Sequence, residues 1–114
     1  GHILLVVTAN RNKGKPETDV QNFVVLEEGD YFINVINGDE ESKDTKVSSA
    51  AIELGSSGEV FSPSDFNKNV NVISKSVHLA SGDYSLVTTT NGQPGSFLTV
   101  IISTFDLSSY EDLP

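Results

Sequence analysis

Residues 77–103 alternate between apolar and polar side chains with a period of two, a pattern typical of β-strands. Tyr84, Leu86 and Thr88 share one face of a predicted strand, and residues 97–102 (FLTVII) are rich in aromatic and β-branched side chains. An L-x-x-G-D-Y motif begins at Leu79 and also occurs at Leu26, with an Asn-Gly pair following each copy. The two copies predict two β-hairpins around which the rest of the chain is arranged.

Short predicted strands continue along the rest of the chain. No helical period extends beyond about one turn, and the one expected helical turn begins at Ser62-Pro63. The expected strands are residues 3–9, 20–26, 31–36, 47–54, 59–61, 70–79, 84–89 and 97–102. Seven or eight short strands at this spacing predict an all-β fold, a single antiparallel β-sandwich of the jelly-roll or immunoglobulin-like type.

The chain length of 114 residues suits one domain with one core. Residues 1–2 have the form of a tag-cleavage remnant, residues 3–103 form the predicted sandwich, and residues 104–114 form an acidic C-terminal tail that is expected to fray. The first strand, residues 3–9, is almost entirely apolar and therefore needs a partner strand. The edge strand 97–102 is the expected partner, and a strand of a neighbouring subunit is the alternative.

The composition excludes several classes of function. The net charge of −9 argues against nucleic acid and anionic membranes as partners, because both are bound through basic surfaces. The absence of cysteine excludes disulfides, thiol chemistry and cysteine-ligated metals. No segment approaches the roughly 20 apolar residues that a membrane-spanning helix requires.

No arrangement of residues predicts a catalytic site. His78 lies within a predicted strand, where an exposed or cross-strand histidine is expected instead of a general base. The carboxylates concentrate in loops, where solvent keeps them ionised, and a glycosidase pair would need a cleft. We therefore predict that the protein is not an enzyme, has no catalytic residues and needs no cofactor, and the sequence assigns no ligand-binding residue.

Calcium binding is the best supported chemical possibility in the sequence. Carboxylates and loop carbonyls in residues 37–46 could provide the oxygen ligands that Ca²⁺ prefers. The candidate ligands are Asp39, Glu40, Glu41 and Asp44. This loop lacks the D-x-D-x-D-G order of a dedicated calcium site, and Lys43 and Lys46 neutralise part of its charge. A solvated acidic loop is therefore the alternative interpretation.

The segment from Ser62 to Asn67 (SPSDFN) is predicted to be structural. Phe66, together with Phe61, is expected to fill the open end of the sandwich. Asp65 is expected to accept hydrogen bonds from nearby backbone N–H groups, and Pro63 and Asn67 are expected to shape the turn.

Several further segments occur in a fixed order between residues 11 and 103. They are Gly14-Lys15-Pro16, Asn37-Gly38-Asp39, Val47-Ser48-Ser49-Ala50, Val60-Phe61-Ser62-Pro63-Ser64-Asp65-Phe66-Asn67 and Pro94-Gly95-Ser96-Phe97-Leu98-Thr99-Val100. In this order the chain resembles an accessory β-sandwich module of bacterial secreted and cell-surface proteins. It departs from that module after Leu54, where Gly-Ser-Ser-Gly replaces Asn-Gly. A looser likeness to carbohydrate-binding and pre-peptidase C-terminal jelly rolls rests on the L-x-x-G-D-Y motifs alone.

The resemblance implies an extracellular module without catalytic residues. The expected function is a structural or adhesive β-sandwich on the surface of a bacterial cell, with any binding in loops at one end. Its expected partners are other domains of the same protein or neighbouring subunits. A carbohydrate-binding module assisted by calcium, with a glycan as ligand, is one alternative. A subunit of a pilus-like or other extracellular filament is another.

Overall fold

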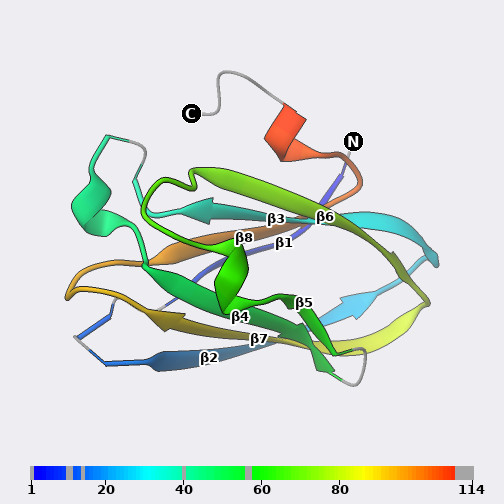
Figure 1. The fold of residues 1–114 in the computed structure, drawn as a ribbon. Coiled ribbons are helices and arrows are strands. Elements are labelled where there is room, and N and C mark those ends of the chain that lie inside the picture. The colour runs from blue at the N-terminus through cyan, green and yellow to red at the C-terminus, as the bar shows by residue number, and fades with distance from the viewer. Residues whose placement is uncertain (1, 10–11, 14, 40, 56–57, 110–114) are drawn as a thin grey trace.

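Eight strands account for most of the chain in the computed structural model, which describes residues 2–9, 12–13, 15–39, 41–55 and 58–109. The strands are β1 (Ile3–Thr8), β2 (Glu17–Val25), β3 (Gly29–Asn37), β4 (Ser49–Leu54), β5 (Glu59–Phe61), β6 (Val72–Leu79), β7 (Gly82–Asn91) and β8 (Leu98–Ser103). Sheet A has the order β1-β8-β3-β6, and sheet B has the order β2-β7-β4-β5. The antiparallel sheets pack face to face (Figure 1), which confirms the predicted all-β sandwich.

Three 3-10 turns of three residues each lie outside the strands. They are η1 (Lys43–Thr45), η3 (Pro63–Asp65) and η4 (Leu107–Ser109). The turn expected after Ser62 is therefore present as η3. Among the described residues, none of the helical segments has the length and apolar composition needed to cross a bilayer.

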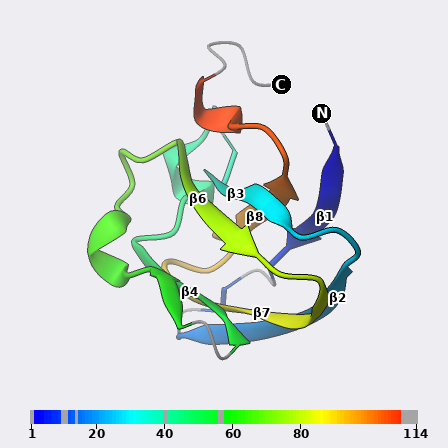
Figure 2. The ribbon, with the colours of Figure 1, turned by 90° about the vertical axis from the view of Figure 1, so that its right-hand side faces the viewer.

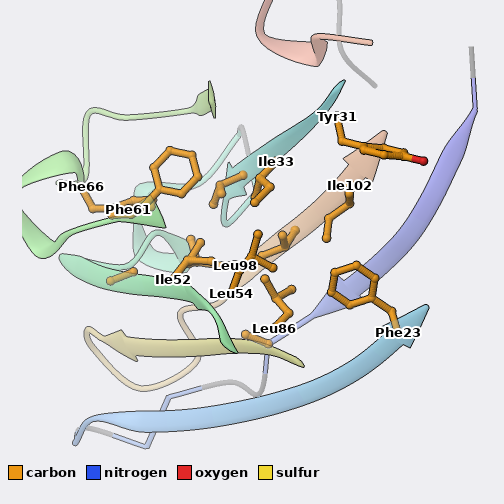
Figure 3. Packing of buried hydrophobic residues seen from close by; sticks show 14 of the residues in the cluster. Phe23, Tyr31, Ile33, Ile52, Leu54, Phe61, Phe66, Leu86, Leu98 and Ile102 are labelled. Carbon is orange, nitrogen blue, oxygen red and sulfur yellow. The ribbon is translucent and has the colours of Figure 1, made fainter. Parts of the chain in front are cut away.

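The core lies between the sheets and is formed by alternate residues of each strand (Figure 3). In β3 the side chains of Ile33 and Val35 are fully buried, and in β4 those of Ile52 and Leu54 face them from the other sheet. Leu86, Leu98, Val100 and Ile102 complete the centre of this layer. This alternate burial agrees with the predicted period-two pattern, because successive side chains of a strand point to opposite faces of the sheet.

The two L-x-x-G-D-Y motifs do not form hairpins. The first joins β2 in sheet B to β3 in sheet A, and the second joins β6 in sheet A to β7 in sheet B. In each of these sheet-crossing arches the tyrosine hydroxyl donates to a backbone carbonyl four residues earlier, Tyr31 to Glu27 at 2.6 Å and Tyr84 to Ala80 at 2.8 Å. The hairpin prediction was wrong because the alternating pattern fixes the buried face of a strand but not the neighbour with which it pairs.

The two arches lie beside one another because β2 pairs with β7 and β3 pairs with β6. Val25 lies opposite Gly82, and Gly29 lies opposite Leu79, so each arch begins where the other ends. The repeated motif therefore closes one end of the sandwich, which we call the arch end.

The first strand pairs with the last, as the sequence predicted. β1 forms an antiparallel ladder with β8, in which Val7 lies opposite Val100 and Leu5 opposite Ile102. Leu4 and Leu5 also pack against the core. An apolar strand at the terminus is thus held within its own chain, and it forms one edge of sheet A.

The segment after β8 folds back onto the outer face of sheet A instead of fraying. Asn34 of β3 is fully buried there, and its side-chain oxygen accepts hydrogen bonds from the Leu107 N–H at 2.9 Å and the Ser74 hydroxyl at 2.6 Å. Its amide nitrogen donates to the Ile101 carbonyl at 2.8 Å and to the Ser103 hydroxyl at 2.9 Å. The prediction of a frayed tail is therefore wrong for residues 104–109, and residues 110–114 lie outside the described part of the chain.

Candidate functional site

Four connecting segments gather at the end of the sandwich opposite the arches, which we call the loop end. They join β1 to β2, β3 to β4, β5 to β6 and β7 to β8, and Figure 1 shows them toward the left. Backbone hydrogen bonds connect them: Gly38 N–H donates to the Phe97 carbonyl at 2.9 Å, and Phe97 N–H donates to the Thr45 carbonyl at 3.0 Å. The loops therefore form one hydrogen-bonded surface on which a binding site could be built.

Two buried asparagines hold the loop end together, and neither was predicted to be buried. The Asn37 side-chain oxygen accepts from the Val47 N–H at 2.8 Å, and its amide nitrogen donates to the Asn67 carbonyl at 3.1 Å. Asn12 donates through its amide nitrogen to the Ser96 hydroxyl at 2.9 Å and accepts from the Thr90 hydroxyl at 3.1 Å. Asn37 ends an otherwise apolar run, and asparagine is depleted in strands. This contrast was the sequence signal that could have pointed to its buried role.

The acidic loop after β3 is shaped by local hydrogen bonds. A carboxylate oxygen of Asp39 accepts from the Glu41 N–H at 3.0 Å, and the Asp39 N–H donates to the Thr45 hydroxyl at 2.6 Å. Gly38 has a φ of 62°, and a Cβ at this position would collide with the Thr45 carbonyl, so only glycine fits this turn.

The proposed calcium ligands lie in this loop, with Asp39, Glu41 and Asp44 exposed to solvent. Glu40 lies outside the described residues. Within the described part of the chain, no three histidine or carboxylate side chains are grouped closely enough to hold a metal ion. Calcium binding at this loop therefore stays a prediction, and it would require the loop carboxylates to move toward one another.

The SPSDFN segment connects β5 to β6 as predicted. Phe66 is 4% exposed, and its ring packs against that of Phe61 with centroids 5.9 Å apart and planes tilted by 58°. The Asp65 carboxylate accepts from the Ser62 N–H at 2.9 Å, and the Lys75 ammonium lies 3.4 Å from the same oxygen. Mainly through the Ser62 hydrogen bond, and also through the charge of Lys75, the pKa of Asp65 lies below its usual value. The expected burial of Phe66 and the expected backbone hydrogen bond of Asp65 are both present.

Replacing Asp65 with alanine is expected to lower the free energy of unfolding by about 1 kcal/mol, as loss of a capping side chain does. The pKa of Asp65 is depressed in the folded protein. The stability that Asp65 contributes is therefore present above its unfolded-state pKa and disappears as the pH falls through its folded-state pKa. Chemical denaturation of the Asp65→Ala variant at neutral and acidic pH measures both effects.

Asp44→Ala provides the matched control. Asp44 lies in the first turn of η1, as Asp65 lies in the first turn of η3, but the Asp44 side chain is exposed. Its replacement is expected to change stability by less than about 0.5 kcal/mol. Equal effects of the two substitutions would contradict a specific role for the Asp65 hydrogen bond.

At the arch end, His78 of β6 is held between two carboxylates of the first arch and β3. Its Nδ1 lies 2.8 Å from an Asp30 oxygen, and its Nε2 lies 2.9 Å from a Glu28 oxygen. Only the doubly protonated imidazolium can donate from both nitrogens, so the arrangement favours the charged form. The hydrogen bond to Glu28, followed by that to Asp30, raises the pKa of His78 above 6.5. The expectation of an exposed, cross-strand histidine is confirmed, since Asp30 lies directly opposite in the ladder.

This geometry predicts that His78 stabilises the fold at acidic pH and less at basic pH. Because the pKa of His78 is raised in the folded state, its contribution to stability is complete below the unfolded-state pKa of about 6.5. This contribution is lost as the pH rises through the folded-state pKa. The stability difference between the parent and His78→Gln should therefore shrink as the pH is raised. Nuclear magnetic resonance titration of the His78 ring gives the pKa directly, and Glu28→Gln should lower it. A His78 pKa that Glu28→Gln leaves unchanged would contradict the assignment.

Two shallow depressions lie away from the loop end. One, of about 530 Å³, is lined by residues that include Val24, Asp83 and Ser85 on β2 and β7. The other, of about 390 Å³, lies between β5 and β6 and is lined by residues that include Val60, Lys75 and Val77. Neither contains the predicted calcium ligands.

Comparisons of the chain with protein-family models, with curated proteins and with solved structures found no match. The fold and the side-chain contacts therefore carry the functional argument.

Proposed function

We propose that this chain is a non-enzymatic structural or adhesive β-sandwich module of a bacterial secreted or cell-surface protein. The observation that carries the proposal is the position of the residues on which the resemblance to such modules depends. Asn37, Phe61, Phe66, Ser96 and Leu98 are all buried, in the core or in the hydrogen-bonded turns of the loop end. Residues placed in this way specify a fold, whereas catalytic residues would converge on a cleft.

A carbohydrate-binding module assisted by calcium is the second candidate. The gathering of four connecting segments at one end, including the acidic loop with Asp39 and Asp44, favours it. Loops that a rigid sandwich holds together are a common location for ligand recognition. Such a module would bind its ligand through this end, and calcium would draw the loop carboxylates together.

Calcium and glycans provide the test that separates the two candidates. For a structural module, we expect no glycan to be retained on an array and no shift of the melting temperature when calcium replaces a chelator. The carbohydrate-binding candidate requires calcium to stabilise the folded state, by about 2.7 kcal/mol at a concentration of one hundred times the dissociation constant.

The control is an Asp39→Asn, Asp44→Asn double variant, which removes two candidate ligands from exposed positions. Glycan retention or calcium stabilisation that this double variant abolishes would overturn the structural proposal in favour of the second candidate.

A further inference from the structure

Each sheet has two edge strands, and they differ in how they are protected against pairing with another molecule. β1 and β6 are the edges of sheet A, and β2 and β5 are the edges of sheet B. Proteins commonly protect edges with charged side chains, which disfavour the approach of a further strand. β2 carries Glu17 and Asp19, β5 carries Glu59, and β6 carries Lys75 and His78. Among these four described edge strands, only β1, with the sequence ILLVVT, has no charged residue.

The side of the sandwich formed by β5 and β6 is also closed by a side chain. Lys75 on β6 reaches across to β5, where its ammonium donates to the Val60 carbonyl at 2.8 Å and lies 4.9 Å from the centre of the Phe61 ring. The same ammonium contacts Asp65 at 3.4 Å. A lysine in this position satisfies part of the β5 backbone and occupies the opening between the two edges.

β1 instead presents apolar side chains to solvent. Ile3 and Val6 are both 56% exposed, and Figure 2 shows β1 along the right-hand margin of sheet A. Val6 lies opposite Ile101 of β8, which extends the exposed apolar area inward along the sheet. An apolar edge strand of this kind is a ready template for the addition of another strand.

We propose that β1 pairs in an antiparallel manner with β1 of a second copy of this chain, about a two-fold axis. The two A sheets, of four strands each, would then form one continuous sheet across the dimer. Two copies of β1 can pair antiparallel without any second binding surface on the chain. A two-fold interface uses the same residues of both subunits. The pairing does not depend on the proposed function.

The charge distribution explains why β1 is the edge that can accept a second copy. Each chain carries a net charge of −9, so two copies repel one another, and a like-charged edge would add to this repulsion. β1 contributes no charge of its own to the contact. The remaining long-range repulsion is screened by salt, so the dimer is expected to become stronger as the ionic strength rises. Pairing of two short strands buries little surface, so the association is expected to be weak.

Sedimentation velocity over low-micromolar to near-millimolar concentrations tests this proposal on the full chain. We expect the mass to rise from that of the monomer toward twice that value, and to do so at lower protein concentration when salt is added. Val6→Lys should weaken the association about tenfold or more, because it adds a like charge from each copy to the shared edge. Ser76→Lys is the control, since Ser76 is exposed on β6, the opposite edge strand of sheet A.

Hydrogen exchange provides a second readout that needs no variant. Amides on the free edge of β1 should become protected from exchange as the protein concentration rises. A monomer at all concentrations would overturn the proposal. So would equal weakening by Val6→Lys and Ser76→Lys, or β1 amides whose protection does not depend on concentration.

Discussion

Phe66→Ala is expected to lower the free energy of unfolding by about 3–5 kcal/mol, as truncation of a core aromatic residue does. Phe66 is 4% exposed and packs against Phe61 between η3 and the edge of the core. Truncation removes the ring-to-ring contact and leaves a cavity beside Phe61, whose ring also lies 4.9 Å from the Lys75 ammonium. Denaturant titration should therefore show a lower midpoint with an unchanged slope.

Leu26→Ala is the control for this experiment, because Leu26 is 82% exposed although it is also a large apolar residue. Its replacement is expected to change the free energy of unfolding by less than about 0.5 kcal/mol. If Phe66→Ala unfolds at the same denaturant concentration as the parent, then the SPSDFN segment does not close the core.

The positions of the strands and their buried faces could be predicted because both depend on local sequence. Alternation places Ile33 and Val35 on one face of β3, and Ile52 and Leu54 on one face of β4, and all four are buried. The pairing of β1 with β8 could also be predicted, since an apolar strand at a terminus requires a partner and the other apolar strand supplies one.

The arches could not be predicted from the same pattern. Residues such as Val25 and Tyr31 have the same burial whether β2 and β3 lie in one sheet or in two, so alternation does not distinguish a hairpin from a crossing. The repeat of the motif was nevertheless meaningful. It marks two connections that pass between the sheets and lie side by side, each with a tyrosine hydroxyl bonded to its own turn.

The polar contacts of the candidate sites depend on residues far apart in the sequence. His78 meets Asp30 and Glu28 across separations of 48 and 50 residues, and no local motif connects them. Asn34 is a comparable case, because its hydrogen bond to Leu107 crosses 73 residues and accounts for the ordered segment after β8. Its position in the middle of an apolar strand was the only sequence signal for a buried polar contact.

Removal of residues 1–8 is expected to abolish cooperative unfolding. The deletion eliminates the ladder in which β1 pairs with β8, from Ile3 opposite Ser103 to Thr8 opposite Thr99. It also removes Leu4 and Leu5 from the core and turns β8 into an unprotected edge of β-branched and apolar residues. Because a domain of this size has a stability of only about 5–15 kcal/mol, the loss of a whole strand should exceed what the remaining core can tolerate.

Circular dichroism during urea titration measures this outcome, and the double variant Ile3→Thr, Val6→Thr is the control. That variant keeps the backbone ladder and changes only two side chains that are more than half exposed, so its transition should stay cooperative. The control also separates the two roles of β1, since outward-facing side chains serve the proposed dimer and inward-facing ones serve the fold. A truncated chain that unfolds in a single sigmoidal transition would show that β1 is dispensable for the fold, leaving association as its remaining role.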